Sequence, residues 1–237
     1  MCGRYTLTAT AEELMAEFEF GEPVALSPRY NVAPTQFMPV IRVQELENEP
    51  GPREAVVMRW GLIPSWAKDA SIGNRTINAR SETVATQASF RAAFKRRRCI
   101  VPVSGFYEWE TVEGPGGKPV KKPHLISRVG GLLGFAGLWE CWRPPDAEPV
   151  LSYTILTTEA NPLMKRLHTR MPVVLSKGDY GLWIDPKLQD AERLKALLCP
   201  YTGGDLVEHV VSTRVNNPRN DDAACVVATD GEGGLFG

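Results

Sequence analysis

Residues 99–110 have the sequence CIVPVSGFYEWE, and this stretch decides the fold class. Its apolar and aromatic residues alternate in the manner of a half-buried strand, so we predict a strand over Cys99–Glu110. Further apolar strands are expected elsewhere in the chain, at Val40–Leu46, Ala55–Trp60, Leu132–Cys141 and Val150–Thr157. An acidic turn at Glu47–Arg53 separates the first two of these, and Gly114–Lys118 is expected to form a hairpin loop.

Helices are expected in five places, at residues 11–19, 82–97, 160–167, 177–183 and 190–198, with Ser81 as the N-cap of the second. Strands and helices follow one another without a βαβα rhythm. We therefore predict an α+β fold, a single domain with a mainly antiparallel, curved, barrel-like sheet flanked by short helices. The chain has no internal repeat and no Gly-, Ser- or Pro-rich linker, so we place one domain at residues 1–228 and a Gly-rich tail at 229–237.

The composition is that of an ordinary globular protein. Of the 237 residues, 43% are hydrophobic and 23% are charged, which excludes wholesale disorder. No apolar run is long enough to span a bilayer, and the first residues lack the apolar segment of a secretory signal. Five cysteines, an odd number, argue against a disulfide framework. We expect a soluble, intracellular protein of the cytoplasm with no membrane partner.

Positive charge is concentrated in one segment. The formal net charge is −1, yet residues 59–100 contain nine Lys or Arg and only two acidic residues. This block has a charge of +7 and the remainder of the chain −8. A segregated basic segment can present a phosphate-attracting face. The run Lys95–Arg98 fits a solvated helix end equally well.

Cys2 is the first candidate for chemistry. Its small side chain predicts removal of Met1, after which Cys2 would carry a free α-amine beside its thiol. Their ordinary pKa values are about 7.7–8.0 and about 8.5, so near neutral pH the amine can form an imine with an aldehyde and the thiol can then close a thiazolidine ring. Alone, a cysteine at this position is more often an arbitrary residue of a frayed terminus. The following segment Gly3–Leu7 has the pattern of an ordered strand and favours the chemical interpretation.

Two further segments carry polar side chains suited to a site. In the loop Thr76–Thr83, Asn78 offers donors and an acceptor, and the guanidinium of Arg80 can bind a phosphate in a fork. The same loop also fits simple helix capping by Ser81. Glu108 lies in an aromatic-rich strand, where burial would raise its pKa and make it a proton donor or acceptor near neutrality. An exposed glutamate on an edge strand is the alternative.

Only three histidines occur, and His168 is the strongest candidate among them. It lies between an expected helix and an apolar strand with Arg170 nearby, an arrangement suited to proton shuttling beside an anion. His124 and His209 lie among Lys, Pro and Glu residues and are expected at the surface. The sequence has no Cys-x-x-Cys or His-x₃-His spacing and no Gly-rich phosphate loop, so neither a metal nor a cofactor is expected.

Together these segments resemble a known family. Six motifs occur in order, namely MCGR (1–4), RYNVAPT (29–35), RWGLIP (59–64), NARSET (78–83), GFYEW (105–109) and HTRMP (168–172). With Val215–Asn217 they cover nearly the whole chain and resemble the SOS-response-associated peptidase (SRAP) family. The resemblance implies a sensor of abasic sites in single-stranded DNA that forms a covalent, lyase-like DNA–protein crosslink through Cys2. It also implies self-removal of Met1, whereas peptidase activity on other proteins stays open.

The resemblance also implies a role for each site residue. Asn78 would orient the α-amine or the sugar, Glu108 would assist proton transfer during ring opening and imine formation, and His168 would act as general acid and base. The thiazolidine would hold the sugar in a form that resists strand-breaking β-elimination. Four further residues are expected to contact DNA, with Arg4, Arg80 and Arg170 on phosphates and Trp66 supporting the exposed strand.

The expected partner is single-stranded DNA that contains abasic sites, bound by a monomer that is nucleoid-associated while on DNA. Whether replication-fork proteins bind as well stays open. Two other functions remain. A cysteine peptidase would use the Cys2 thiol with His168 as base. A non-catalytic module for single-stranded DNA would need the basic face but not Cys2.

Overall fold

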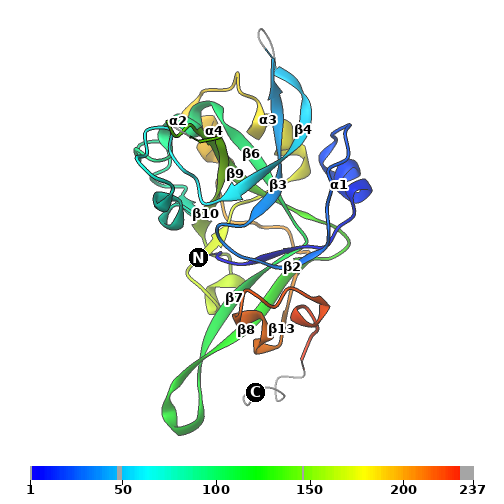
Figure 1. Ribbon diagram of the computed structural model, residues 1–237. Helices are drawn as coiled ribbons and strands as arrows, with labels where there is room; N and C mark the ends of the chain where they lie inside the picture. The colour runs from blue at the N-terminus through cyan, green and yellow to red at the C-terminus, as the bar shows by residue number, and fades with distance from the viewer. Residues whose placement is uncertain (1, 47–49, 146, 230–237) are drawn as a thin grey trace.

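Two curved sheets form most of the structure, a computed structural model that describes residues 2–46, 50–145 and 147–229. The smaller sheet has the order β13-β8-β7-β1-β2, and its pairs are antiparallel. Its strands are β1 (Tyr5–Leu7), β2 (Arg29–Val32), β7 (Gly105–Glu113), β8 (Pro119–Arg128) and β13 (Leu206–Val210). Figure 1 shows that the hairpin of β7 and β8 extends away from the rest of the molecule.

The larger sheet closes on itself. Its order is β11-β10-β4-β3-β6-β9-β12, with β5 beside β10, and an additional pairing of β10 with β9 makes a ring of strands. The strands are β3 (Phe37–Glu45), β4 (Pro50–Trp60), β5 (Asn78–Arg80), β6 (Arg98–Val103), β9 (Leu133–Trp142), β10 (Val150–Glu159), β11 (Arg170–Pro172) and β12 (Val174–Leu175). Among the described strands, the only parallel pairs are those of β10 with β4 and of β10 with β5. The predicted α+β class with a mainly antiparallel, curved sheet is confirmed.

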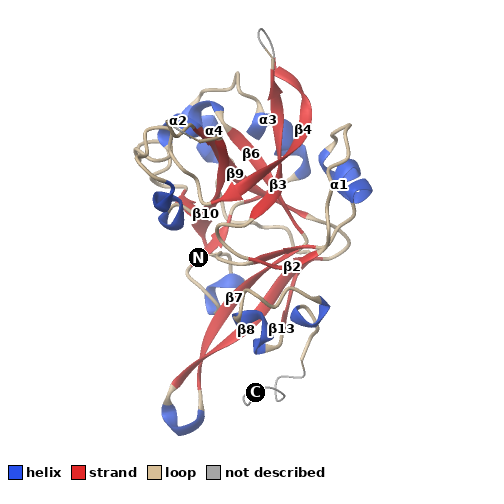
Figure 2. Ribbon diagram, viewed as in Figure 1, coloured by secondary structure: helices blue, strands red, loops and turns tan. Residues whose placement is uncertain are grey.

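The helices are short and lie around the strands (Figure 2). The α-helices are α1 (Ala11–Phe18), α2 (Arg91–Arg96), α3 (Tyr180–Ile184) and α4 (Ala191–Ala196). The 3₁₀ helices are η1 (Ala70–Arg75), η2 (Pro115–Gly117), η3 (Met164–Arg166), η4 (Lys177–Asp179), η5 (Thr213–Asn216) and η6 (Ala223–Cys225). Helix α1 starts with a capping box, in which Thr10 and Glu13 each accept the other's backbone N–H. Across the described ranges, no helix has the length and apolar character needed to cross a membrane.

The helix predicted over residues 82–97 is mostly wrong. Only α2 at its end is helical, while residues 81–86 and 88–90 form turns. The Thr86 hydroxyl donates to the carbonyl of Thr83 at 3.2 Å, the kind of local side-chain bond that competes with helical backbone bonding. The helix expected at 160–167 likewise shrinks to η3. Helices α1 and α4 lie within the helices predicted at 11–19 and 190–198, and α3 overlaps the one predicted at 177–183 but ends one residue later.

The strand predicted over Cys99–Glu110 is two strands that belong to different sheets. The break is at Ser104, whose backbone N–H donates to Thr6 and whose hydroxyl accepts from Thr8, both at 2.9 Å. The chain therefore passes from the larger to the smaller sheet at this residue. The other predicted strands and the hairpin loop at 114–118 are confirmed. Of the predicted turn at 47–53, residues 50–53 belong to β4, and 47–49 lie outside the described residues.

A stack of aromatic rings fixes β1 against the larger sheet. The ring centres of Tyr5 and Trp60 are 5.2 Å apart, and those of Trp60 and Tyr153, which form a stacked pair, are 6.3 Å apart. The hydroxyls of Tyr5 and Tyr153 share a hydrogen bond of 2.7 Å, so the polar end of each buried ring is satisfied. This contact holds the first strand of the chain, and with it the preceding residues, between the two sheets.

One arginine of the basic run is a buried structural residue. Arg98 is only 2% exposed, which corrects the expectation of a solvated helix end at that position. Its guanidinium donates to five backbone carbonyls, those of Phe94, Lys95, Trp183, Asp185 and Leu188. It therefore joins α2 to the segment around α3.

All five cysteines are free thiols.

We expect Arg98→Ala to lower the free energy of unfolding by about 3 kcal/mol or more, because buried carbonyls lose their donors. The neighbouring Arg96, which is exposed, provides a matched control. Arg96→Ala is expected to change the value by no more than about 0.5 kcal/mol. Urea denaturation of both variants measures the difference, and equal stability of the two would contradict the structural role of Arg98.

Candidate functional site

Cys2 is buried three residues before β1, at the boundary of the two sheets. Its backbone carbonyl accepts a hydrogen bond of 2.8 Å from Nδ2 of Asn78, the first residue of β5. Burial raises the pKa of the Cys2 thiol well above its usual range, and the negative charge of Glu108 raises it further. The thiol is thus held in its neutral form. Met1, whose removal the sequence predicts, lies outside the described residues.

The chain immediately after Cys2 is clamped by Arg4. Nη1 of Arg4 donates to Oδ1 of Asn31 at 2.7 Å and to the carbonyl of Val215 at 2.8 Å. The Arg4 guanidinium also lies 5.8 Å from the ring centre of Trp109. Arg4 was predicted to hold a phosphate, and the structure gives it these contacts within the protein. Any role in DNA binding stays a prediction.

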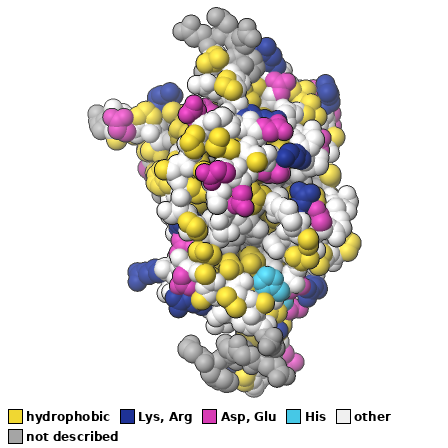
Figure 3. Space-filling model, turned by 90° about the vertical axis from the view of Figure 1, so that its right-hand side faces the viewer, with side chains coloured by type: hydrophobic (Ala, Val, Ile, Leu, Met, Phe, Trp, Pro, Cys, Tyr) yellow, Lys and Arg dark blue, Asp and Glu magenta, His cyan; other side chains and the backbone are white. Residues whose placement is uncertain are grey.

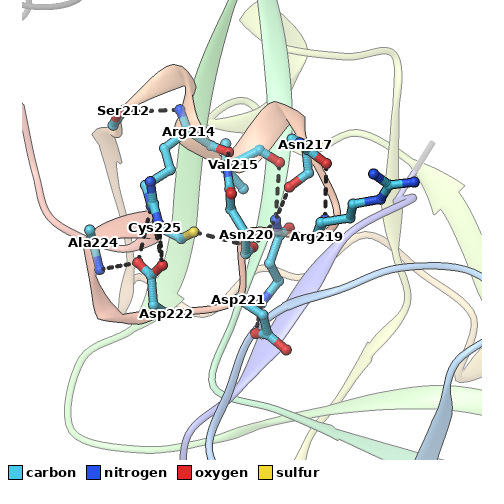
Figure 4. Close-up of polar contacts among 11 residues, drawn as sticks. Ser212, Arg214, Val215, Asn217, Arg219, Asn220, Asp221, Asp222, Ala224 and Cys225 are labelled. Atoms are coloured by element: carbon cyan, nitrogen blue, oxygen red, sulfur yellow. Dashed lines mark hydrogen bonds and ion pairs between the residues drawn. The ribbon is translucent and has the colours of Figure 1, made fainter.

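The partner of Arg4 is a folded C-terminal segment, residues 212–225, shown in Figure 4. An ion pair of 2.5 Å between Arg214 and Asp222 closes it. The buried Asn31 amide donates to three of its carbonyls, those of Val215, Asn217 and Asn220. The motif residues around Asn31 and Val215 thus have a structural use, which is to hold Arg4 and the start of the chain against the C-terminal segment.

Glu108 lies on β7 and is buried, with 4% of its surface exposed. By strand alternation it shares a face with Phe106, whose ring packs into the main core at 5.5 Å from Phe135. Burial raises the pKa of Glu108 from 4.5 to about 7, while the positive charge of Lys121 partly opposes the shift. The expectation that burial would tune this carboxyl is confirmed. Near neutral pH it can both give and accept a proton.

His168 lies in the loop between η3 and β11. Its Nδ1 accepts a hydrogen bond of 2.9 Å from the backbone N–H of Arg170, so in the neutral ring the proton is on Nε2. Burial lowers the pKa of His168, and the positive charges of Lys121 and Arg170 contribute in the same direction. The ring is therefore neutral at physiological pH. Strand β11, which follows this loop, and strand β5, which begins with Asn78, pair with the two sides of β10.

The predicted DNA-binding residues fall into two groups. Arg80 is exposed at the end of β5, and Trp66 is 59% exposed in a loop. Arg170 instead binds both carboxylate oxygens of Glu82, at 2.5 and 3.0 Å, and donates to the carbonyl of Thr157 at 2.6 Å. Two predicted contacts therefore face outwards, and Arg170, like Arg4, is already engaged within the protein.

The structure connects three of the four predicted catalytic residues to one another, and the fourth, His168, shares with Glu108 the charge of Lys121. Asn78 binds Cys2 directly, the Glu108 charge acts on the Cys2 thiol, and the Lys121 charge acts on both Glu108 and His168. Lys121 was not predicted, because a lysine in a hairpin arm gives no sequence signal for a site. The roles of the four residues remain predictions.

His124 was predicted at the surface, and this prediction is wrong. It is 2% exposed and lies directly opposite Glu108 in the pairing of β7 with β8. The available signal was alternation: His124 has the same parity in β8 as the buried Ile126. The charged neighbours Lys121 and Lys122 hid that signal. His209, by comparison, is partly exposed.

Several basic side chains of residues 59–100 are buried or form contacts within the protein. Arg98 is buried, Arg97 pairs with Glu140 at 2.6 Å, and Arg59 donates to the carbonyl of Gly61. Figure 3 shows a face on which basic and acidic side chains are interspersed, with hydrophobic ones between them. That face is the α1 side of the molecule, away from α2 and most of the basic segment. The net charge of the segment overstates the positive charge that it presents to solvent, because Arg97 and Arg98 are engaged within the protein.

Comparisons with known proteins identify the family of the chain. The sequence matches the family model described as SOS response associated peptidase (SRAP) over residues 1–218. The "Abasic site processing protein YoqW" of Bacillus subtilis (strain 168) is 38% identical over 224 residues, covering 93% of this chain and 96% of that protein. The "Abasic site processing protein HMCES" of Xenopus tropicalis is 31% identical over 265 residues, covering 96% and 78%. A crystal structure of a protein from Bacteroides thetaiotaomicron has a TM-score of 0.82 at 26% identity, covering 96% of this chain and 100% of that one.

The raised pKa of Glu108 predicts a pH-dependent cost to stability. The folded protein binds the proton of the Glu108 carboxyl more tightly than the unfolded chain does. The stabilisation that comes from this proton is therefore fully present below pH 4.5 and is lost as pH rises through about 7. Glu108→Gln cannot ionise. Between pH 5 and 8, the stability of the wild type should fall relative to this variant by on the order of 3 kcal/mol. Urea denaturation at both pH values measures it; a constant difference would contradict the shifted pKa.

Proposed function

Because the chain belongs to the SOS response associated peptidase (SRAP) family, we propose that it processes abasic sites in single-stranded DNA by forming a covalent crosslink through Cys2. Relatives from bacteria and vertebrates are named abasic site processing proteins. The observation that carries the proposal is the 2.8 Å hydrogen bond from Asn78 to the Cys2 carbonyl, next to Glu108 with its pKa of about 7. It holds the residue that supplies the nucleophiles beside a group that exchanges protons at neutral pH.

The nucleophile is the α-amine of Cys2, which becomes available once Met1 is removed. An N-terminal amine has an ordinary pKa of about 7.7–8.0, so a useful fraction is unprotonated at neutral pH. The bond from Asn78 fixes the backbone of Cys2 and so restricts where this amine can lie. Such preorganisation converts a collision between two molecules into a reaction within one complex.

The first steps open the sugar and form an imine. In the closed abasic sugar, a base removes the proton of the C1′ hydroxyl while an acid protonates O4′, the C1′–O4′ bond breaks, and an aldehyde results. Glu108 is suited to this exchange because both of its protonation states are populated near its pKa of about 7. The amine nitrogen then adds to C1′, and loss of one water gives the imine, with His168 supplying and taking up the protons.

The last step closes the ring. The Cys2 sulfur adds to C1′ of the imine, the C=N bond becomes single, and the thiol proton ends on nitrogen. The sum of the reaction is amine, aldehyde and thiol giving a thiazolidine and one water, with no oxidant or reductant. Because burial keeps the thiol protonated, the amine is the first nucleophile and the thiol follows. The closed ring removes the imine that would promote β-elimination and strand breakage.

The same thiol environment argues against a general cysteine peptidase. Peptidases of this type use a thiolate, which requires a depressed thiol pKa beside a positively charged group. Here burial and Glu108 raise the pKa of Cys2 instead. Nδ1 of His168 is moreover occupied by the backbone of its own loop. Any cleavage by this site is therefore proposed to be limited to removal of Met1.

We place the DNA strand over the outward-facing residues. Arg80 is exposed two residues from Asn78 and is suited to a phosphate, and the exposed ring of Trp66 can stack on a base. A phosphate at Arg170 would first have to displace the Glu82 carboxylate, so its contribution is expected to be smaller. We propose that the protein acts as a monomer in the cytoplasm and joins the nucleoid when bound to DNA.

The α-amine gives the sharpest prediction about the reaction. Protein that retains Met1 behind an added N-terminal tag should bind the oligonucleotide but form no stable crosslink. Cys2→Ala keeps a free amine after processing, so it should give an imine that survives denaturation only after trapping by borohydride. Denaturing electrophoresis with a single-stranded oligonucleotide containing one abasic site distinguishes these two variants from the processed wild type. Equal crosslinking by the tagged protein would sink the thiazolidine mechanism.

A second prediction concerns binding without chemistry. Arg80→Ala should weaken binding to single-stranded DNA and reduce the slope of log K against log salt by about 0.7, the value for one phosphate contact. Arg170→Ala should change the slope less, because Glu82 already occupies that guanidinium. Arg193→Ala, at an exposed arginine of α4, serves as the control. Fluorescence titration across salt concentrations measures the slopes, and one unchanged by Arg80→Ala places the strand elsewhere.

A further inference from the structure

A row of four charged side chains lies beside the proposed site and takes no part in the chemistry described above. Arg166 at the end of η3 contacts Oε2 of Glu208 on β13, and Oε1 of Glu208 contacts Nδ1 of His124 on β8. On the other side of the ring, Nε2 of His124 lies 3.1 Å from Oε2 of Glu110 on β7. We call Arg166, Glu208, His124 and Glu110 the charged row.

The charged row begins and ends next to the site residues. Arg166 lies two residues before His168, at the start of the loop that holds that ring. The other end is Glu110, two residues after Glu108 on β7, and the inner member His124 is the direct cross-strand partner of Glu108. Directly opposed residues of an antiparallel pair place their side chains on the same face, so His124 and Glu108 are neighbours. The row is therefore a physical link between the loop of His168 and the strand of Glu108.

The inner part of this link is largely shielded from water. The side chain of His124 is 3% exposed and that of Glu208 is 11% exposed, whereas Arg166 at the outer end is 48% exposed. A buried pair of this kind is weak evidence for stability, because well-packed apolar residues often serve as well. Its geometric demands are strict, however, since both ring nitrogens of His124 face carboxylate oxygens. Such a link therefore fixes the positions of its side chains more than it stabilises the folded protein.

The charges around His124 come from four elements. Glu108 and Glu110 lie on β7, Glu208 on β13, Arg166 on η3 and Lys122 on its own strand, all of them within reach of its ring or its partners. Neutralising one member changes the charge that the other members experience, and one of these, His124, lies directly opposite Glu108. A change in the row should therefore be seen in the pH dependence of any reaction that uses Glu108.

We propose that the charged row positions Glu108 relative to His168 for the proton transfers of crosslink formation. Its members are positioning residues, since they act through Glu108 and His168 and do not touch the reacting atoms. This inference rests on the proposed function and adds to it four residues outside the catalytic set. It predicts that breaking the row slows the reaction without weakening DNA binding.

The test uses Glu208→Gln, which keeps the shape of the side chain and removes its charge. Asp205→Asn is the matched control, because Asp205, one residue before β13, forms an ion pair of 2.6 Å with Arg128 of β8 outside the charged row. Single-turnover crosslinking rates are measured from pH 5.5 to 8.5 with a saturating abasic oligonucleotide. Affinity is measured with a tetrahydrofuran abasic analogue, which cannot react, and stability by urea denaturation.

For Glu208→Gln we expect a rate lowered by about tenfold and a shifted pH midpoint, with affinity within about twofold of the wild type. Asp205→Asn should keep the wild-type rate and midpoint. Arg166→Ala, at the exposed end, covers the case in which Glu208→Gln fails to fold, and Arg166→Lys should restore part of its lost rate. If the charged-row variants match Asp205→Asn in rate and midpoint, the positioning role is overturned alone. No adduct from the wild type would overturn the proposed function, and the positioning role with it.

Discussion

The structure depends on one constraint, which is that the beginning of the chain is held between two sheets. A terminal segment is usually poorly ordered unless something ties it down. Here β1 pairs with β2 on one edge and β7 on the other, and the Tyr5 hydroxyl binds that of Tyr153 in the larger sheet. Arg4 and Asn78 then fix the residues on either side of Gly3. The proposed chemistry requires this, because a frayed Cys2 could not meet Glu108 reproducibly.

Burial sets the electrostatics of the site. It raises the pKa of the Cys2 thiol, raises that of Glu108 to about 7 and lowers that of His168. Each shift favours the uncharged form, so at neutral pH the thiol and the imidazole are neutral and the carboxyl is near its midpoint. Such a site can move protons in both directions at little cost, which suits a sequence of ring opening, dehydration and ring closure.

Local patterns predicted the fold well where a single element was enough. Alternation located the strands of both sheets and placed Glu108 in one of them. Prediction failed where partners distant in sequence decide the outcome, as at Ser104, where the chain changes sheets, and at His124, whose burial depends on Glu110 and Glu208. The four proposed catalytic residues could be singled out from the sequence and their roles followed from the family resemblance, whereas the use of Arg4 and Arg170 inside the protein required the structure.

The central claim is that both nucleophiles of Cys2 end on one carbon of the abasic sugar. Intact-mass measurement of the crosslinked species, followed by nuclease and protease digestion and peptide mapping, tests it most directly. The account predicts an adduct that has lost Met1 and one water relative to its components, with the sugar on a peptide that begins at Cys2 and has no free thiol at that residue. A sugar on a lysine, or on a peptide that still begins with Met1, would contradict it.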